Sequence, residues 1–445
     1  MKRVSDAEYE KKNIFGHYLL ELSIENLRCY GDKQTMKFSD TNGKPYHWTI
    51  ILGDNGSGKT CLLKSIVSVA PSPKKITGQY QDIRLYPGLF DWKEQWNPQR
   101  HDGEKPTHIS AEITGGYGFD NLLPDTRQTL EIIQDHKKYA DDITANNEEY
   151  GKLGDFLCFA YGATRKMGHV SLSDNKYYSM ASLSLFDDEA PLINVEEFFL
   201  KADYEAKTAK SKQSIAQRDR IKKILIGILP EVEDIRIKKG IDINRNVVLL
   251  TKFGWVRINN MSLGYKSLIA WVVDFSSRMF YYHHTKADPL AQPAVVLIDE
   301  IDLHLHPIWQ RNIISCLSEQ FPNTQFIATA HSPLIVQAAL DANLILLKRN
   351  NDQVEVAGNP EIIKNWRIDQ ILTSDLFGIS GVRSVQTEIL LQKRRDLLLK
   401  KNLSAADKKM LEALEDEIGF LPVAETHEYI KAMQLIEKAA GKLNK

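Results

Sequence analysis

The stretch Gly53-Asp-Asn-Gly-Ser-Gly-Lys-Thr60 decides the fold expected of this 445-residue chain. It matches the pattern GxxxxGK[ST] and follows a short apolar, β-branched run, Trp48–Leu52. After it, apolar residues recur at helical spacing from Leu62 to Val67. Glycines let successive backbone N–H groups turn inward around phosphate oxygens, and a helix N-terminus adds a positive dipole. A chance glycine turn would need neither the strand nor the helix, so we expect a phosphate-binding loop.

The loop residues have expected roles toward a nucleoside triphosphate. Lys59 is expected to reach the β- and γ-phosphates, and Thr60 is expected to bind Mg²⁺ through its hydroxyl. Backbone groups of the loop and of the first helical turn complete the site. The expected phosphate-binding residues are Gly53, Asn55, Gly56, Ser57, Gly58, Lys59, Thr60 and Cys61.

A second chemical feature is Val295-Val-Leu-Ile-Asp-Glu300, an apolar strand that ends in two carboxylates. Open α/β sheets bind ligands at the carboxyl ends of their strands. We expect Asp299 to hold Mg²⁺ through water and Glu300 to polarise the attacking water as the catalytic base. His331 ends the next strand and is expected to contact the γ-phosphate. An apolar run followed by Asp-Glu is, by itself, more often an ordinary strand end. Because the chain also contains the phosphate loop, we favour a catalytic role for these two carboxylates.

Asn259-Asn-Met-Ser-Leu-Gly-Tyr-Lys-Ser267 stands at the start of an expected helix. The order of phosphate loop, Ser-x-Gly segment, carboxylate strand and histidine resembles the ABC-type ATPases of the SMC/RecF-like branch. The resemblance implies an α/β fold with a mostly parallel sheet, with ATP and Mg²⁺ as cofactors. In that family two heads enclose two ATP molecules, so Ser262 and Gly264 would touch the γ-phosphate bound to the other copy. The usual Leu-Ser-Gly-Gly-Gln is Met-Ser-Leu-Gly-Tyr here, which leaves the rate of hydrolysis open.

Two further segments support this resemblance. Ile301-Asp-Leu-His-Leu-His-Pro307 resembles the stretch after the carboxylates in RecF-like and OLD-like ATPases, which implies a nucleotide-site role for Asp302. Its two histidines have no companion ligands nearby, so packing or dimer contact is favoured over a metal site. Ile24-Glu-Asn-Leu-Arg-Cys-Tyr30 resembles the family's first-strand element, whose arginine lies by the nucleotide. Arg28 is therefore a candidate, and a surface charge at a strand end is the alternative.

The resemblance narrows further at two places. Tyr161-Gly-Ala-Thr-Arg165 and residues 366–378 resemble elements of small bacterial defence ATPases of the Septu and retron-associated kind. This implies a separate partner nuclease of the HNH type. After Leu347 there is no second strand-and-acid pattern and no zinc-finger-like or HNH cluster. The chain is therefore not expected to carry its own nuclease.

Changes in composition and in hydrophobic periodicity divide the chain into segments. We expect the ATPase head to be assembled from several segments, interrupted by two insertions and followed by a helical region for dimer or partner contacts. The expected divisions are 1–70 with 151–185 for the lobe carrying the phosphate loop, 71–150 for an irregular α+β insertion, 186–230 for a basic helical insertion, 231–358 for the rest of the head and 359–445 for the helical C-terminal region.

Charge and composition limit the partners. The formal net charge is −1, from 57 basic and 58 acidic residues, so any contact with nucleic acid requires a local patch. Lys201–Lys223 carries eight basic and three acidic side chains, which fits either a DNA-backbone contact or a solvated helix face. No apolar run approaches the about 20 residues that a membrane helix needs. The four cysteines are dispersed, and the cytoplasm is the expected location.

Three functions are consistent with these features. The first is a dimerising cytoplasmic ATPase that regulates a separate nuclease in bacterial antiphage defence. The second is a RecF-like ATPase of DNA repair or replication, which shares the head and differs in its partner. The third is a scaffold that binds ATP with little turnover, which the altered Ser-x-Gly segment keeps open.

Overall fold

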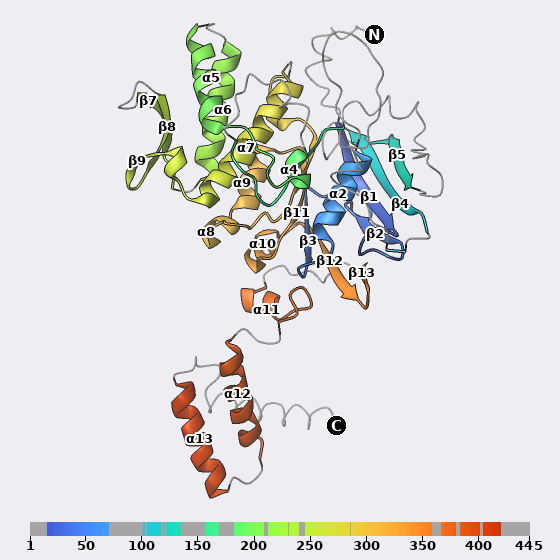
Figure 1. Cartoon of the computed structure of the whole chain (residues 1–445), viewed down its shortest axis with the longest axis vertical. Coiled ribbons are helices and arrows are strands. Elements are labelled where there is room, and N and C mark those ends of the chain that lie inside the picture. Colours follow the sequence, from blue (N-terminus) through green and yellow to red (C-terminus); the bar gives the residue numbers. More distant parts are fainter. Residues whose placement is uncertain are drawn as a thin grey trace. The chain divides into compact units, whose positions relative to one another are not determined.

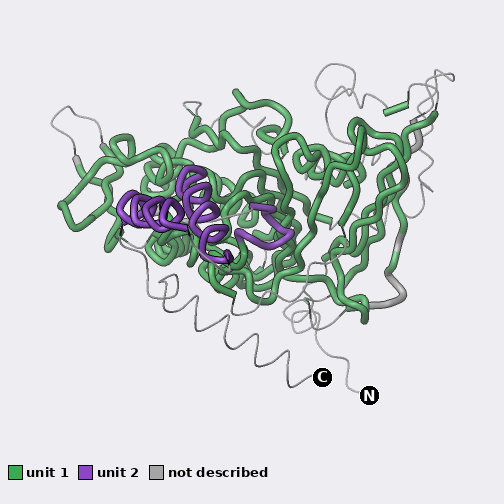
Figure 2. Tube along the Cα trace, turned by 90° about the horizontal axis from the view of Figure 1, so that it is seen from below, with its two compact units in different colours: residues 1–371 green, residues 372–445 purple. Residues whose placement is uncertain are grey.

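A computed structural model describes most of the chain, and two compact units, residues 1–371 and 372–445, are described separately below (Figures 1 and 2). The expected insertion 71–150 and the expected helical tail 359–445 lie partly outside the described residues. The described residues are 16–70, 101–102, 105–116, 119, 122–134, 156–168, 182–208, 212–229, 231–239, 245–284, 286–357, 366–379, 383–400 and 404–419.

A six-stranded sheet forms the centre of the first unit, in the order β13-β12-β3-β11-β10-β6. All neighbouring strands are parallel except β13, which is antiparallel to β12. Continuous apolar runs suit strands that are buried on both faces. The expected α/β fold with a mostly parallel sheet is confirmed. The strands are β3 (Trp48–Gly53), β6 (Cys158–Tyr161), β10 (Ala294–Ile298), β11 (Thr324–Thr329), β12 (Asn343–Asn350) and β13 (Gln353–Val356).

A second, antiparallel sheet lies on one side of the first unit, in the order β2-β1-β4-β5. Helix α2 (Lys59–Val69) packs between the two sheets, and its apolar side chains share one core with residues of both (Figure 1). The segment 71–150, expected to be an irregular α+β insertion, contributes two long strands, β4 and β5, which pair with each other, and β4 also pairs with β1. The strands are β1 (Gly16–Glu25), β2 (Gln34–Lys37), β4 (Thr107–Gly116) and β5 (Leu122–Gln134).

Helices cover the opposite face of the central sheet. Alternation along β6 sends Ala160 toward α2, whereas Phe159 and Tyr161 pack against Phe275 and Trp271 of α7. The three-stranded sheet β7-β8-β9 leads into α7 through a short 3₁₀ turn, η3. The bounds are α5 (Val195–Thr208), α6 (Lys212–Ile228), β7 (Asp234–Lys239), β8 (Arg245–Thr251), β9 (Gly254–Arg257), η3 (Ile258–Asn260), α7 (Leu263–Tyr282) and α9 (Ile313–Gln320).

The segment expected to be a basic helical insertion forms α5 and α6, which pack against each other. Helix α6 also packs against α7 and α9, and it buries Ile221, Ile224 and Leu225 completely or almost completely. This helix is therefore part of the body of the first unit. The other short elements described in this unit are α4 (Leu183–Phe186), η4 (Pro289–Ala291), α8 (Pro307–Gln310) and α10 (Pro333–Ala338), and α11 (Ile368–Leu372) spans the boundary between the two units.

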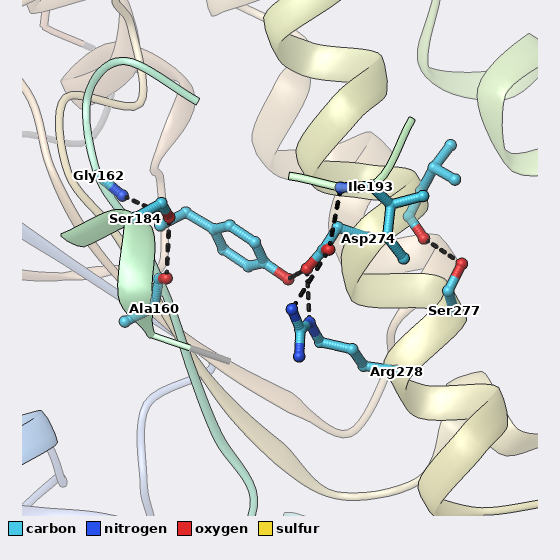
Figure 3. Close-up of polar contacts among 9 residues, drawn as sticks. Ala160, Gly162, Ser184, Ile193, Asp274, Ser277 and Arg278 are labelled. Carbon is cyan, nitrogen blue, oxygen red and sulfur yellow. Dashed lines mark hydrogen bonds and ion pairs between the residues drawn. The ribbon is translucent and has the colours of Figure 1, made fainter. Parts of the chain in front are cut away.

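A buried polar cluster ties α7 to the edge of the central sheet (Figure 3). Asp274 on α7 is fully buried and accepts hydrogen bonds from Arg278 Nε at 2.6 Å and from the Tyr161 hydroxyl at 2.9 Å. Burial raises the pKa of Tyr161, so the phenol stays protonated and donates. Tyr161 ends β6, and its carbonyl accepts a 2.8 Å bond from the N–H of Asp299. The cluster thus fixes the strand edge beside the first of the two carboxylates.

The second unit contains α12 (Val385–Leu398) and α13 (Ala405–Ile418), each begun by a serine cap. Arg394 pairs with Glu415 at 3.2 Å, and Lys400 pairs with Asp407 at 2.7 Å. These two ion pairs join the α12 segment to α13. Among the helices that the structure describes, none is both long and apolar enough to cross a lipid bilayer.

We predict that Asp274→Ala destabilises the first unit strongly. The substitution leaves the Arg278 guanidinium, which is 4% exposed, without its carboxylate. Breaking a buried ion pair from one side costs about 3–5 kcal/mol of unfolding free energy. The matched control is Glu189→Ala, which removes an exposed ion pair with Lys166 and should cost less than about 1 kcal/mol. Urea denaturation followed by tryptophan fluorescence measures both, and equal midpoints for the two variants would contradict the assignment.

Candidate active site

The phosphate loop joins β3 to α2 through three glycines with positive φ. These angles are +150° at Gly53, +78° at Gly56 and +80° at Gly58, a region that side chains rarely adopt. A Cβ at Gly53 would lie 2.5 Å from Ser57 Oγ, and one at Gly58 would lie 2.5 Å from Cys29 Sγ. Conformation therefore favours glycine at all three positions, and close packing also excludes a side chain at Gly53 and Gly58.

The loop presents a buried cation and a buried hydroxyl. Lys59 Nζ donates to the carbonyls of Gly53 and Asp54, both at 2.8 Å. Burial lowers the pKa of Lys59, and nearby carboxylates, Asp299 foremost, offset part of this effect. The hydroxyl of Ser57 is buried and has no hydrogen-bond partner in the described part of the chain. A buried donor without a partner is costly, so this loop suits a ligand with acceptor oxygens.

Asp299, which follows β10, is hydrogen-bonded to the start of α2 and to the end of β11. Its Oδ2 accepts from the Thr60 hydroxyl at 2.7 Å, and its Oδ1 accepts from the Thr329 hydroxyl at 2.7 Å. Thr329 also accepts from the N–H of Glu300 at 2.7 Å. The structure thus brings the loop residue Thr60 and both carboxylate residues together. Sequence reasoning missed Thr329, and the available signal was a hydroxyl at the carboxyl end of a buried strand two residues before the expected histidine.

The backbone of Glu300 is held in an unusual conformation. Its φ is +49°, which is uncommon for a residue other than glycine. The Glu300 carbonyl accepts from Arg165 Nη2 at 2.7 Å and from the N–H of Leu303 at 3.0 Å. Arg165 is 2% exposed and belongs to the Tyr161–Arg165 segment, which the sequence marked only as a point of resemblance. It is the second site residue that sequence reasoning did not assign.

Asp302 and His331 lie at the same edge of the sheet. The Asp302 carboxylate accepts from the backbone N–H of His331 at 3.1 Å and 3.3 Å. The side chain of His331 is exposed. The structure therefore brings these two predicted residues together beside the Asp299 cluster.

The Ser-x-Gly segment begins α7. Ser262 is exposed at the N-cap and makes no side-chain cap hydrogen bond. Gly264 is buried, and a Cβ there would lie 2.2 Å from the carbonyl oxygen of His304. The ring of Tyr265 packs edge-on against Trp309, with 4.2 Å between ring centroids. The start of α7 therefore packs on the segment that follows Glu300, while Ser262 itself faces solvent.

The remaining predicted residues occupy different surroundings. Arg28 is exposed and has φ +50°, in a turn whose neighbour Tyr30 donates to the carbonyl of Gly58 at 3.0 Å. Asn55 is exposed in the loop. Cys61 lies in the hydrophobic core, and burial raises the pKa of its thiol to about 12. Its backbone N–H in the first turn of α2, and not its side chain, is the group available to a phosphate.

The two histidines after the carboxylates have local structural contacts. His306 caps α8, because its Nδ1 accepts from the N–H of Ile308 at 3.3 Å. His304 has φ +62° and offers its carbonyl to the close packing at Gly264. Within the described ranges, no group of three potential metal-ligating side chains is found.

Comparison with known proteins identifies the family. A model described as "AAA domain, putative AbiEii toxin, Type IV TA system" matches residues 49–337, well over half of the chain. The chain belongs to this AAA-domain family. A second AAA-domain model matches residues 21–74 of this chain. Both matches include the phosphate loop, and the longer one also includes the two carboxylates and the histidine.

Two curated relatives of this AAA-domain protein carry descriptive names. The Septu protein PtuA of Bacillus mycoides (strain KBAB4) is 24% identical over 372 residues, covering 82% of this chain and 46% of the relative. The retron Vc95 probable ATPase of Vibrio cholerae serotype O1 biovar El Tor is 26% identical over 375 residues, covering 71% of each chain. The chain thus spans about half the length of the PtuA relative. These relatives confirm the resemblance to the Septu and retron-associated ATPases.

A solved structure is also similar. The SMC head domain from Thermotoga maritima is 12% identical with a TM-score of 0.41, covering 77% of this chain and 99% of that domain. This likeness is too low to support an inference about function.

Proposed function

We propose that this AAA-domain protein binds and hydrolyses ATP with Mg²⁺ and dimerises around the nucleotide. In this proposal its nucleotide state regulates a separate HNH-type nuclease in cytoplasmic antiphage defence. The observation that carries the proposal is the pair of 2.7 Å hydrogen bonds that join Asp299 to Thr60 and Thr329. They place a phosphate loop, a carboxylate strand and a third strand end at one point.

The donor set at that point fits a magnesium nucleotide. Mg²⁺ prefers oxygen ligands, and the Thr60 hydroxyl and the Asp299 carboxylate supply them next to the phosphate loop. The buried hydroxyl of Ser57 and the cation of Lys59 match phosphate oxygens. Thr60 and Asp299 would hold Mg²⁺, whose charge would neutralise negative charge developing on the phosphates.

The chain's own residues account for the remaining chemistry in this proposal. Lys59 binds the β- and γ-phosphates, and the loop N–H groups orient them. Glu300 accepts a proton from the attacking water, and its backbone is held on both sides by Thr329 and Arg165. His331 lies close by through its N–H bond to Asp302 and contacts the γ-phosphate. Hydrolysis then needs no covalent intermediate on the protein.

A second copy of the chain completes the site in this proposal. Among the described residues, the Ser262 hydroxyl makes no hydrogen bond to the phosphate loop of its own chain. It is exposed at the N-terminus of α7, where backbone N–H groups favour an anion. A γ-phosphate bound to another copy is the anion that Ser262 and Gly264 would contact.

The defence role and the nuclease partner rest on the relatives named Septu PtuA and retron ATPase. The second unit offers a surface for a partner, since the side chains of Val385, Ile389 and Met410 are at least half exposed. Exposed apolar side chains on one helical unit support protein contact.

The basic helix α6 gives little support to a RecF-like function on DNA. Its described cations are largely matched by carboxylates within the same unit. Arg218 pairs with Asp203 at 3.0 Å and with Asp219 at 2.9 Å. Lys222 pairs with Asp234 at 2.6 Å. Paired cations attract a DNA backbone less than free ones, so the solvated helix face is the better interpretation.

Turnover of ATP by the wild type and by Glu300→Gln separates an ATPase from a scaffold. We expect Glu300→Gln to lower kcat at least about 100-fold while retaining ATP binding, because the base is lost and the phosphate loop is intact. Lys59→Ala should abolish ATP binding, and the exposed control Glu189→Gln should behave as wild type. A phosphate-release assay and calorimetric titration measure these quantities. Negligible wild-type turnover with tight ATP binding would contradict hydrolysis and favour the scaffold, and equal turnover in both proteins would contradict the role of Glu300.

Light scattering tests the shared site. We expect Glu300→Gln to dimerise when Mg²⁺ and ATP are added, because bound ATP is not consumed. Adding Ser262→Arg to that protein should keep it monomeric with ATP affinity unchanged, since the residue acts on the nucleotide of the other copy. A dimer that forms equally well with Ser262→Arg would show that this surface is not the interface.

A further inference from the structure

Arg165 is a buried cation directly beside the proposed catalytic base. It follows β6, the strand that pairs with β10, and it is 2% exposed. Its Nη2 donates to the Glu300 carbonyl at 2.7 Å, and its Nε has no hydrogen-bond partner among the described residues. The guanidinium therefore donates a hydrogen bond to the Glu300 carbonyl, while its Nε–H group is left without an acceptor among the described residues.

The electrostatic setting of Arg165 is also unusual. No carboxylate forms an ion pair with it in the part of the chain that the structure describes, although Asp299, Glu300 and Asp302 are near enough to favour its charge. Burial lowers the pKa of Arg165 to about 10, so the side chain remains a cation at neutral pH. A buried charge without a close partner is unfavourable for stability and typical of functional sites.

The backbones of both residues are strained. Arg165 has φ +38° and Glu300 has φ +49°, both in the left-handed region that residues other than glycine rarely adopt. Such conformations persist only where the surroundings impose them. The Thr329 hydroxyl accepts a hydrogen bond from the N–H of Glu300, and Arg165 donates one to the carbonyl of Glu300. Loss of the guanidinium would let this peptide relax and would move the carboxylate, while the phosphate loop keeps its own contacts.

We propose that Arg165 is a positioning residue for hydrolysis, which holds the peptide of Glu300 so that its carboxylate meets the attacking water. This inference rests on the proposed role of Glu300 as the base. In this role Arg165 acts on the position of the catalytic base and does not itself bind the nucleotide. Its removal should therefore slow the chemical step and leave ATP affinity nearly unchanged.

The test compares full-length Arg165→Gln, Arg165→Lys, Glu300→Gln and the double variant Arg165→Gln/Glu300→Gln. Exposed Lys166→Gln, one residue further on, is the matched control and should keep wild-type kcat. We expect Arg165→Gln to lower kcat about 10–100-fold, because small displacements of a catalytic group are costly in rate. The ATP Kd should stay within about threefold, and the double variant should hydrolyse no more slowly than Glu300→Gln alone.

Arg165→Lys supplies a pH signature that a purely structural role would not produce. A lysine buried at this position has its pKa lowered, so it loses its charge as the pH rises. We expect this variant to keep part of the activity near pH 7 and to lose it by about pH 9, whereas wild type stays active because its cation persists. This variant also serves if Arg165→Gln does not fold, as judged by circular dichroism.

Three results would overturn the inference. They are an unchanged kcat in Arg165→Gln, a loss of ATP affinity proportional to the loss of rate, and a double variant far slower than Glu300→Gln. An Arg165→Lys pH profile identical in shape to wild type would also count against it. If the wild-type protein does not hydrolyse ATP, the proposed function fails and this inference fails with it. If the wild type hydrolyses ATP and one of the results above is found, only the inference about Arg165 fails.

Discussion

The carboxylate of Asp299 is the point on which the rest of this structure depends. Each of its oxygens accepts one hydroxyl at 2.7 Å, from Thr60 at the start of α2 and from Thr329 at the end of β11. Asp299 is only 5% exposed, so its charge is stabilised by these two donors and by the nearby cation of Lys59. Because the buried carboxylate is bonded to both segments, the positions of the end of β10, the start of α2 and the end of β11 depend on one another. This constraint turns a phosphate loop and a strand end into one site.

Two lines of packing lead from this point to the exposed N-terminus of α7. Tyr161, whose carbonyl binds the N–H of Asp299, donates to Asp274 on α7 (Figure 3). On the other side, the loop after Glu300 packs its His304 carbonyl against Gly264 at the start of the same helix. Helix α7 is thus attached to both sides of the carboxylate strand. Packed, buried groups therefore connect the Asp299 cluster with the start of α7 from two directions.

The sequence predicted the fold and the loop well because their signals are local. The glycine pattern ending in Lys59 and the apolar strand ending in Asp299 each lie within a few consecutive residues. Thr329 and Arg165 could not be assigned, because their importance arises from contacts that span 30 and 135 positions. The pairing of β4 with β1 was missed for the same reason. Basic residues in α6 suggested DNA, but their partners Asp203 and Asp234 are visible only in the folded chain.

In the proposed function, Asp299 and the phosphate loop form a single site for Mg²⁺ and ATP. Calorimetric titration of ATP into the Glu300→Gln protein, with and without Mg²⁺, tests it most directly when repeated with Asp299→Asn added. We expect Mg²⁺ to tighten ATP binding at least about tenfold in the first protein and to have little effect in the second. An equal effect of Mg²⁺ in both proteins would contradict it.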